Sequence, residues 1–214
     1  MFRVLLDGRP VRTPAKALVV LPTERLARAV AAEWEAQGDE IKPASMPLVR
    51  LVNSALDGVR GREAEVAADI AKYAASDLVC YRAESPAELV QRQVAHWDPL
   101  LDWAAEALGC RLARTTGLMP VTQAEAAIKA VLAAIDAKDI YRLAALHVAT
   151  TLLGSAILGL ALMRRRISGD AAWTAAHVDE DWQAEQWGHD GEAEERRAAR
   201  RRDLGAAVTI IELA

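Results

Sequence analysis

Two periods of apolar and polar residues follow one another along the chain, first that of a strand and then that of a helix. The segment FRVLLDGRPVRTP (2–14) has apolar residues on both sides of Asp7-Gly8, a dipeptide that favours a tight hairpin turn. ALVVLP (17–22) supplies a third short strand. We therefore expect a small antiparallel sheet, which needs a covering helix to be stable.

Helical spacing begins at Thr23, and Gly38 stands where the first helix would end. A second helix is predicted over 48–59, because apolar residues repeat there at intervals of three and four. Its opposite stripe is polar and consists of Arg50, Asn53, Asp57 and Arg60. A third helix is predicted over roughly 62–76, and 77–82 is interpreted as extended.

Capping signals mark two helix starts in the middle of the chain. Ser85-Pro86-Ala87-Glu88 predicts one, with Ser85 as its cap, and Thr122-Gln123-Ala124-Glu125 predicts another. Pro99 lies inside the first of these helices, so we expect a kink there or a restart capped by Asp98. The segment 116–121 is the predicted loop between the two helices.

Residues 143–163 form an apolar run without a charged side chain, and three arginines follow it at 164–166. A run of this length can span a bilayer, which needs about 20 apolar residues, and a basic flank suits the cytoplasmic end of a span. The same run can be a central helix that a bundle buries on all sides. Because every neighbouring helix is amphipathic and needs an apolar partner, we favour the buried helix and keep the membrane span as the alternative.

The last third of the chain predicts two helices. The first begins near Asp170, carries Trp182 on its apolar face and ends at Gly188, and Asp190 caps the second. The second helix has carboxylates in its first turn and arginines from 196 to 202 in its last turns, an order that suits the helix dipole. The tail, 205–213, is expected to form a short strand that returns to the sheet.

The composition favours helices, since apolar residues make up 52% of the chain while Tyr and Phe number only three and one. We predict an α+β fold: a small N-terminal antiparallel β-sheet with helices over 1–80, then a mainly α-helical orthogonal bundle over 81–214. The net charge of −4 gives no long-range attraction to nucleic acid or anionic lipid. Cys80 and Cys110 are interpreted as reduced, buried thiols of a cytosol-like compartment, and no signal peptide opens the chain.

Motifs typical of enzymes and metal sites are absent from the sequence, which has no GxSxG, GxGxxG, GxxxxGK or HExxH. The histidines, at 96, 147, 177 and 189, are scattered. His177 and Asp181 provide too few ligands for zinc and are interpreted as a solvated helix face, and His147 as a hydrogen-bonded core histidine. We predict no catalytic residue, no metal and no cofactor. An unrecognised enzyme that uses His147 or His177 with nearby carboxylates stays an alternative.

The stretch WQAEQWG (182–188) contains two tryptophans five residues apart. Trp182 fits the buried stripe, whereas Trp187 lies well round the helix from it. An exposed tryptophan beside carboxylates is typical of a contact surface, where aromatic side chains contribute much of the binding energy. Trp187 can instead fold back over the next helix as a hydrophobic staple, and the sequence leaves both interpretations open.

The chain resembles the F1-ATPase assembly chaperones that bind the alpha subunit of ATP synthase in mitochondria and alphaproteobacteria. The resemblance covers nearly the whole chain and depends on segments that occur in the same order. These are LLDGRPVRTP (5–14), LPTERLARAVAAEWEAQG (21–38), MPLVRLVNSALD (46–57), YAASDLVCYRAESP (73–86), WDPLLDWA (97–104) and DEDWQAEQWGHDGEA (179–193).

The resemblance implies a chaperone without catalysis. It would bind the unassembled alpha subunit and shield from aggregation the surface that later meets the beta subunit. It also implies a monomer in the bacterial cytoplasm, or in the mitochondrial matrix for eukaryotic relatives, with no nucleic acid and no stable membrane insertion. Members of the family usually carry a further strand before VLLDGRP, so a sheet edge is expected to be exposed here.

The resemblance also suggests where the client binds. We expect the contact residues on the tryptophan- and acid-rich stretch near the C-terminus: Glu185, Trp187, Asp190, Glu192 and Glu194. Trp182 is expected to support them from the core, and Gly188 to break the helix. Asn53 and Asp57 match a polar motif of the family and are expected to tie the two domains together.

Overall fold

The first 21 residues fold back on themselves as short antiparallel strands. The hairpin pairs β2 (Leu5–Leu6) with β3 (Arg9–Pro10), and β1 (Phe2–Arg3) pairs with β4 (Val20–Leu21). Asp7 and Gly8 both adopt positive φ, 50° and 75°, as a tight two-residue hairpin turn requires. The predicted antiparallel sheet is therefore confirmed. The computed structural model describes residues 1–117, 119–188 and 190–214; Leu118, in the predicted loop, and His189 lie outside them.

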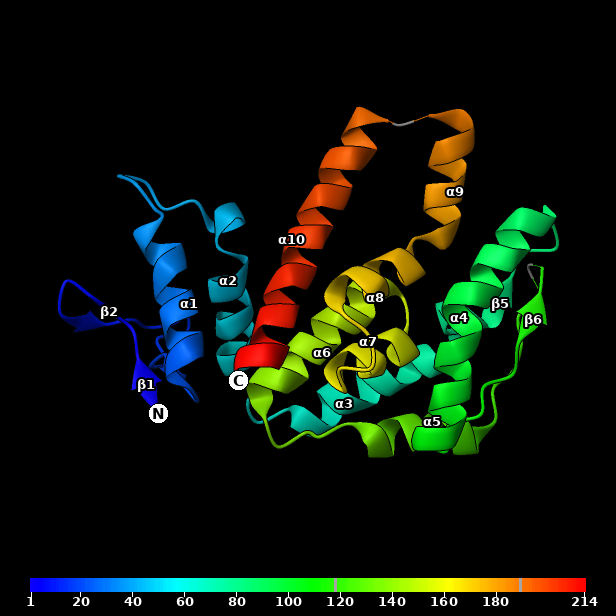
Figure 1. Cartoon of the computed structure of the whole chain (residues 1–214). Helices are drawn as coiled ribbons and strands as arrows, with labels where there is room; N and C mark the ends of the chain where they lie inside the picture. The colour runs from blue at the N-terminus through cyan, green and yellow to red at the C-terminus, as the bar shows by residue number, and fades with distance from the viewer. Residues whose placement is uncertain (118, 189) are drawn as a thin grey trace.

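Helices form most of the remaining chain (Figure 1), and the predicted α+β class is confirmed. The α-helices are α1 (Glu24–Glu35), α2 (Pro47–Ser54), α3 (Glu63–Lys72), α4 (Ala87–Ala107), α5 (Glu125–Ala134), α6 (Ile140–Leu153), α7 (Ala156–Met163), α8 (Gly169–Ala176), α9 (Val178–Trp187) and α10 (Gly191–Leu213). Single helical turns flank some of them: η1 (Pro43–Ser45), the π-helical η2 (Ala55–Val59), η3 (Tyr73–Ser76) and η4 (Leu78–Cys80). β5 (Tyr81–Arg82) and β6 (Thr115–Thr116) pair in parallel.

The first two helices begin with caps of different origin. Thr23, where the helical spacing begins, caps α1 with its own hydroxyl, although the helix ends at the cap Ala36 and not at Gly38. Helix α2 has no side-chain cap of its own. The Glu33 carboxylate of α1 instead accepts hydrogen bonds from the N–H groups of Leu48 and Val49, at 2.9 and 2.7 Å. A neighbouring helix therefore satisfies donors that a helix start leaves without partners.

Both predicted capping boxes in the middle of the chain are wrong. Pro86 is the N-cap of α4 and makes no side-chain hydrogen bond, and the helix continues through Pro99 to Ala107. Helix α5 begins after Ala124, and Thr122 does not cap it. A tertiary contact accounts for the start of α5. The Gln123 side chain accepts a hydrogen bond from the Ala113 N–H at 2.7 Å and donates one to the Ala113 carbonyl at 2.8 Å, which fixes the segment before α5 to the preceding loop.

The long apolar run is split into two buried helices. Gly154 ends α6 in the left-handed conformation, with φ of 65°, and Ser155 caps α7. Asp77, which is fully buried, accepts a hydrogen bond from the Ile157 N–H at 3.1 Å, and burial raises the pKa of this carboxyl to about 6. Residues 143–163 therefore form two shorter helices and not the single span of the alternative, and among the described residues no helix is both long enough and apolar enough to cross a bilayer.

The C-terminal segment differs from the expectation in two places. The helix predicted from Asp170 is interrupted at His177, which ends α8 and precedes α9. The tail is not a strand: 205–213 are the last turns of α10, where Ala207, Ile210 and Ile211 are buried. The arginines at 196–202 therefore lie in the middle of a helix, away from the C-terminal end of its dipole.

Two hydrogen bonds connect the N-terminal segment to α10 and to α6. The Thr23 hydroxyl donates to the carbonyl of Leu213, and the Tyr141 hydroxyl of α6 donates to the carbonyl of Val20. In Figure 1 the C-terminal end of α10 accordingly lies beside α2 and α6, while its N-terminal half extends away from the bundle. The core forms around α6, α7 and the second half of α10, where most side chains are buried.

Gly159 allows α6 and α7 to pack closely, and we expect its replacement to destabilise the protein. A Cβ atom at this position would lie 2.5 Å from Oγ1 of Thr150, which is buried. Gly159→Ala should therefore lower the free energy of unfolding by roughly 1–3 kcal/mol, the usual cost of overpacking a core.

Gly205→Ala is the matched control, because a Cβ there meets nothing within 4 Å and the position is exposed on α10. The control should gain up to about 1 kcal/mol from helix propensity. Urea unfolding of both variants measures the difference, and equal effects would contradict this account.

Candidate functional site

Helices α9 and α10 form an arm that extends from the bundle (Figure 1). We define the arm as residues 178–188 and 190–200. Gly188, with φ of 88°, ends α9, and Asp190 caps α10 through a 3.0 Å hydrogen bond to the N–H of Glu192. The predicted helix end and cap are confirmed. Trp187, at the end of α9, is 78% exposed.

A cleft of about 530 Å³ separates the two helices of the arm. Its α9 wall includes Glu180 and Trp187, and its α10 wall includes Glu194, Arg196 and Arg200. The first six residues of α10 are all exposed. The arm therefore presents an aromatic side chain, carboxylates and guanidinium groups to solvent around one concave surface.

Helix α4 holds α9 in place. The guanidinium group of Arg92 donates two hydrogen bonds to the Glu185 carboxylate, at 2.8 and 2.7 Å, and lies 4.9 Å from the ring centroid of Trp182. The hydrogen bond from Arg92 lowers the pKa of Glu185. One residue further, the buried side chain of Gln93 donates to Asp179 at 2.7 Å. Glu185 thus has an intramolecular partner that the sequence did not reveal.

Helix α10 is held at the base of the arm by ion pairs. Arg197 pairs with Asp181 of α9, and Arg201 pairs with Asp170 of α8 at 2.8 Å. Both guanidinium groups also lie over the ring of Trp173, at 5.7 and 5.9 Å from its centroid. Cation–π contacts and ion pairs therefore act on the same two arginines.

His177 is buried beneath these arginines, so its interpretation as part of a solvated helix face is wrong. Its ring stacks on Trp173 with centroids 3.8 Å apart, and Nδ1 donates to the Trp173 carbonyl at 2.8 Å. Burial lowers the pKa of the imidazole. Asp181, its expected partner, binds Arg197 instead.

The expected contact residues lie together on the arm, with different surroundings. Glu192 is exposed and lies 3.4 Å from Arg196, one turn further along α10. Glu194 lines the cleft. Trp182 is half-buried beneath Arg92, at the surface of the bundle and not in its core.

The other two expected residues lie elsewhere. Asp57, in η2, accepts hydrogen bonds from the Thr13 hydroxyl at 2.6 Å and from the Ala15 N–H at 3.1 Å. It therefore fixes the loop after the hairpin to the end of α2. Asn53 of α2 is half-buried, and no hydrogen bond of its side chain is found within the described part of the chain.

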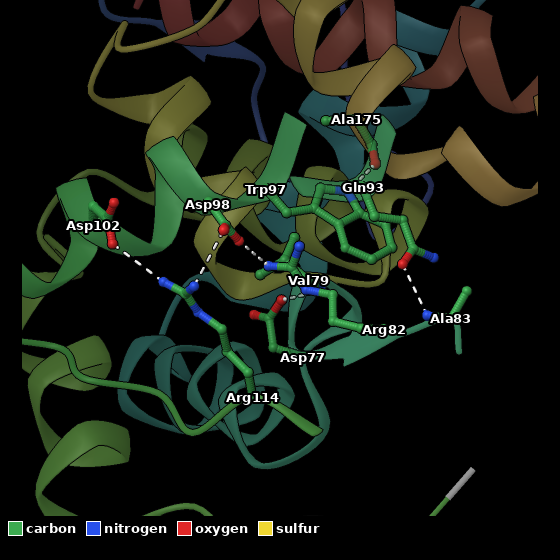
Figure 2. Close-up of polar contacts among 10 residues, drawn as sticks. All are labelled: Asp77, Val79, Arg82, Ala83, Gln93, Trp97, Asp98, Asp102, Arg114 and Ala175. Carbon is green, nitrogen blue, oxygen red and sulfur yellow. Dashed lines mark hydrogen bonds and ion pairs between the residues drawn. The ribbon is translucent and has the colours of Figure 1, made fainter. Parts of the chain in front are cut away.

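A polar network around α4, which the sequence did not predict, joins this helix to β5, to the residue before β6 and to α8 (Figure 2). Arg82, whose side chain is only 9% exposed, pairs with Asp98 at 2.6 Å and lies 5.0 Å from the ring centroid of Trp97. Arg114 contacts Asp98 and Asp102, both at 3.2 Å. Burial lowers the pKa of the Arg82 guanidinium group.

The same face of α4 continues to the base of the arm. The indole N–H of Trp97 donates to the carbonyl of Ala175 in α8 at 2.6 Å, and the Gln93 side chain accepts from the Ala83 N–H at 2.8 Å (Figure 2). The segment WDPLLDWA was the available signal, since an acid such as Asp98 beside a tryptophan in an apolar stripe needs a partner when it is buried.

The side chains that enzymes use are scattered over the described structure, apart from His177 and Glu180, whose Nε2 and Oε2 atoms lie 3.4 Å apart. His147 is half-buried, and no described residue hydrogen-bonds its imidazole, which corrects its interpretation as a hydrogen-bonded core histidine. Cys80 and Cys110 are free and buried, as predicted, and burial raises the pKa of their thiols to about 12 and about 11. Over 1–117, 119–188 and 190–214 there is no group of three His, Cys, Asp or Glu side chains that could hold a metal ion.

Comparison with known proteins gives a consistent result. The family model described as ATP12 chaperone protein matches residues 1–105. The crystal structure of Atp12 from Paracoccus denitrificans is 43% identical, with a TM-score of 0.91 over 98% of this chain and 90% of that one. The chain belongs to the ATP12 chaperone family.

A second solved structure gives a similar match. The Atu1473 protein of Agrobacterium tumefaciens, described as a candidate chaperone, is 46% identical, with a TM-score of 0.93 over 99% of this chain and 79% of that one. A mutant of the Paracoccus Atp12 gives the same values as the unmodified protein. Since ATP12 is a family of chaperones and not of enzymes, the enzyme alternative is set aside.

In the α4 network, loss of the Asp98 carboxylate should destabilise the protein more than loss of the Arg82 guanidinium group. Asp98→Ala leaves the buried Arg82 cation without a partner, and breaking a buried pair in this way costs roughly 3–5 kcal/mol. Arg82→Met should cost much less, because Asp98 keeps Arg114 and the thioether replaces two buried guanidinium nitrogens that have no partner. Asp102→Ala, at an exposed partner of Arg114, is the control and should change little. Urea unfolding of the three variants gives the order, and a larger loss for Arg82→Met than for Asp98→Ala would refute it.

Proposed function

We propose that this chain is an assembly chaperone for the F1 sector of ATP synthase, which binds the unassembled alpha subunit through the arm. Membership of the ATP12 family supports the chaperone role. We take the alpha subunit as the client because the sequence resembles the chaperones that bind it. We further propose that the protein acts as a monomer in the bacterial cytoplasm and covers the surface of the alpha subunit that later contacts the beta subunit.

The exposure of Trp187 is the observation that carries the assignment to the arm. A staple over the next helix would bury this side chain, whereas 78% of it is exposed. Tryptophan is among the residues most enriched at binding hot spots, and it loses little conformational freedom when it binds. An exposed tryptophan at the end of a projecting helix therefore suits a contact surface.

The polar surroundings of Trp187 suit a temporary complex. Asp190, Glu192 and Glu195 are exposed at the start of α10, and arginines follow along the same helix. Charged groups at the rim of an interface speed association and confer selectivity more than they add affinity. A chaperone must release its client to the beta subunit, so one aromatic anchor within a charged rim fits the task better than a large apolar interface.

Glu185 would act in a different way from the carboxylates of α10. Its carboxylate is held by both terminal nitrogens of Arg92, so it positions α9 on α4. A charge reversal there should affect client binding through displacement of α9. Reversal of Glu192, whose exposed carboxylate lies 3.4 Å from Arg196, should affect the contact surface directly.

Trp187→Ala should weaken binding of the alpha subunit about tenfold or more, since loss of a hot-spot aromatic side chain costs roughly 2 kcal/mol. Met119→Ala is the matched control, because this side chain is 74% exposed but lies outside the arm. The measurement is isothermal titration calorimetry with the alpha subunit from the same organism, with the beta subunit as a specificity control.

Two outcomes would contradict the proposal at different levels. If neither subunit binds the wild-type chain, the client assignment is wrong. If the alpha subunit binds and neither Trp187→Ala nor Glu192→Lys weakens it, the client is right and the docking surface lies outside the arm. Circular dichroism of each variant excludes loss of helix as the cause of any effect.

A further inference from the structure

A second hollow lies on the other side of α10 from the arm cleft. It is a groove of about 310 Å³ between α2, α6 and α10. Leu51 of α2 and Val148 and Leu152 of α6 give it an apolar lining, and Arg50 and Asp203 stand at its edge. Val148 and Leu152 remain half-exposed, so the fold itself does not fill the groove.

The charged and hydroxyl groups around the groove already have partners. Arg50 pairs with Asp203 at 2.5 Å, and the Ser54 hydroxyl donates to the Arg50 carbonyl at 3.0 Å. The Thr151 hydroxyl lies 3.4 Å from that of Tyr73. These groups leave no net charge to attract an ionic ligand. An apolar pocket within a satisfied polar rim is the anatomy of a site for one anchoring side chain.

The groove is continuous with the arm through Arg200. This residue lines the arm cleft, and its guanidinium group donates to the carbonyl of Leu152, which lines the groove, at 2.7 Å. The cleft is lined by α10 residues up to Arg200 and the groove by Asp203, so the two hollows flank adjacent parts of α10. A protein that contacts the arm over an ordinary interface, about 800 Å² on each partner, reaches the groove without any rearrangement of the bundle.

We propose that the groove receives one large apolar side chain, of the leucine, methionine or phenylalanine class, from the client that the arm binds. This inference rests on the proposed function, and it gives the client a second anchor on the opposite side of α10 from Trp187. The imidazole of His147, at the edge of the groove, is available to hydrogen-bond the client backbone beside the anchor. The groove is too small for a whole helix, and its paired charges give an acidic or basic side chain no advantage.

Filling the groove tests the inference. Thr151→Trp places an indole at the exposed edge of α6, where it occupies the groove. Thr174→Trp is the matched control, because this threonine is exposed on α8 and does not line the groove. With the alpha subunit as the probe, Thr151→Trp should weaken binding about tenfold, whereas Thr174→Trp should bind like wild type. Both variants should keep the melting temperature of the wild-type protein.

A second variant and a second measurement test the inference even if Thr151→Trp does not fold. Ser54→Trp fills the groove from the α2 side and should weaken binding in the same way. Hydrogen exchange of the wild-type chain with the alpha subunit bound should protect 47–54 and 147–152 as well as the arm. Protection confined to the arm would overturn the inference.

The remaining outcomes separate this inference from the proposed function. If Trp187→Ala weakens binding while both groove variants bind like wild type, the groove assignment is wrong and the arm assignment stands. If the wild-type chain does not bind the alpha subunit, both are wrong. Light scattering after size exclusion tests another occupant: a wild-type dimer that Thr151→Trp converts to a monomer would place a second copy of this chain in the groove.

Discussion

The position of the arm depends on hydrogen bonds made by the buried face of α4. Gln93 joins the Ala83 backbone to Asp179 of α9, and the Trp97 indole reaches the backbone of α8. A buried donor or acceptor that loses its partner keeps the whole cost of its desolvation. Helices α8 and α9 can therefore move only if these bonds are replaced. The exposed ion pair of Arg92 with Glu185 further orients α9 on α4.

The stability of this protein and the chemistry of its surface reside in different groups. The core around α6 and α7 is close-packed, to the point that Gly159 leaves no room for a methyl group. The start of α10, by contrast, is exposed on every side and carries charges that solvent screens. Because this surface contributes little to the stability of the fold, its side chains can suit reversible binding. An exposed tryptophan at its end likewise destabilises the fold little.

The sequence predicted local elements where one short stretch contains all the interacting groups. The Asp-Gly turn, the helix end at Gly188 and the cap at Asp190 were of this kind, and each is confirmed. Predictions were wrong where a distant residue competed: Gln123 anchors the segment before α5 to Ala113, so Thr122 does not act as a cap. For the candidate site, the stretch that forms the arm was predicted, but the binding of Glu185 to Arg92 was not, because the two residues are 93 positions apart.

The sequence by itself determined which residues favour helix or strand, where apolar faces lie and to which family the chain is similar. These properties depend on neighbours within about one or two turns, so periodicity and short motifs contain them. Only the tertiary structure decided that the apolar run breaks at Gly154 and that the tail completes α10. It alone decided that Trp187 is exposed while His177 is buried. Burial and charge pairing depend on segments far apart in the chain, and their free energies follow from which helices meet.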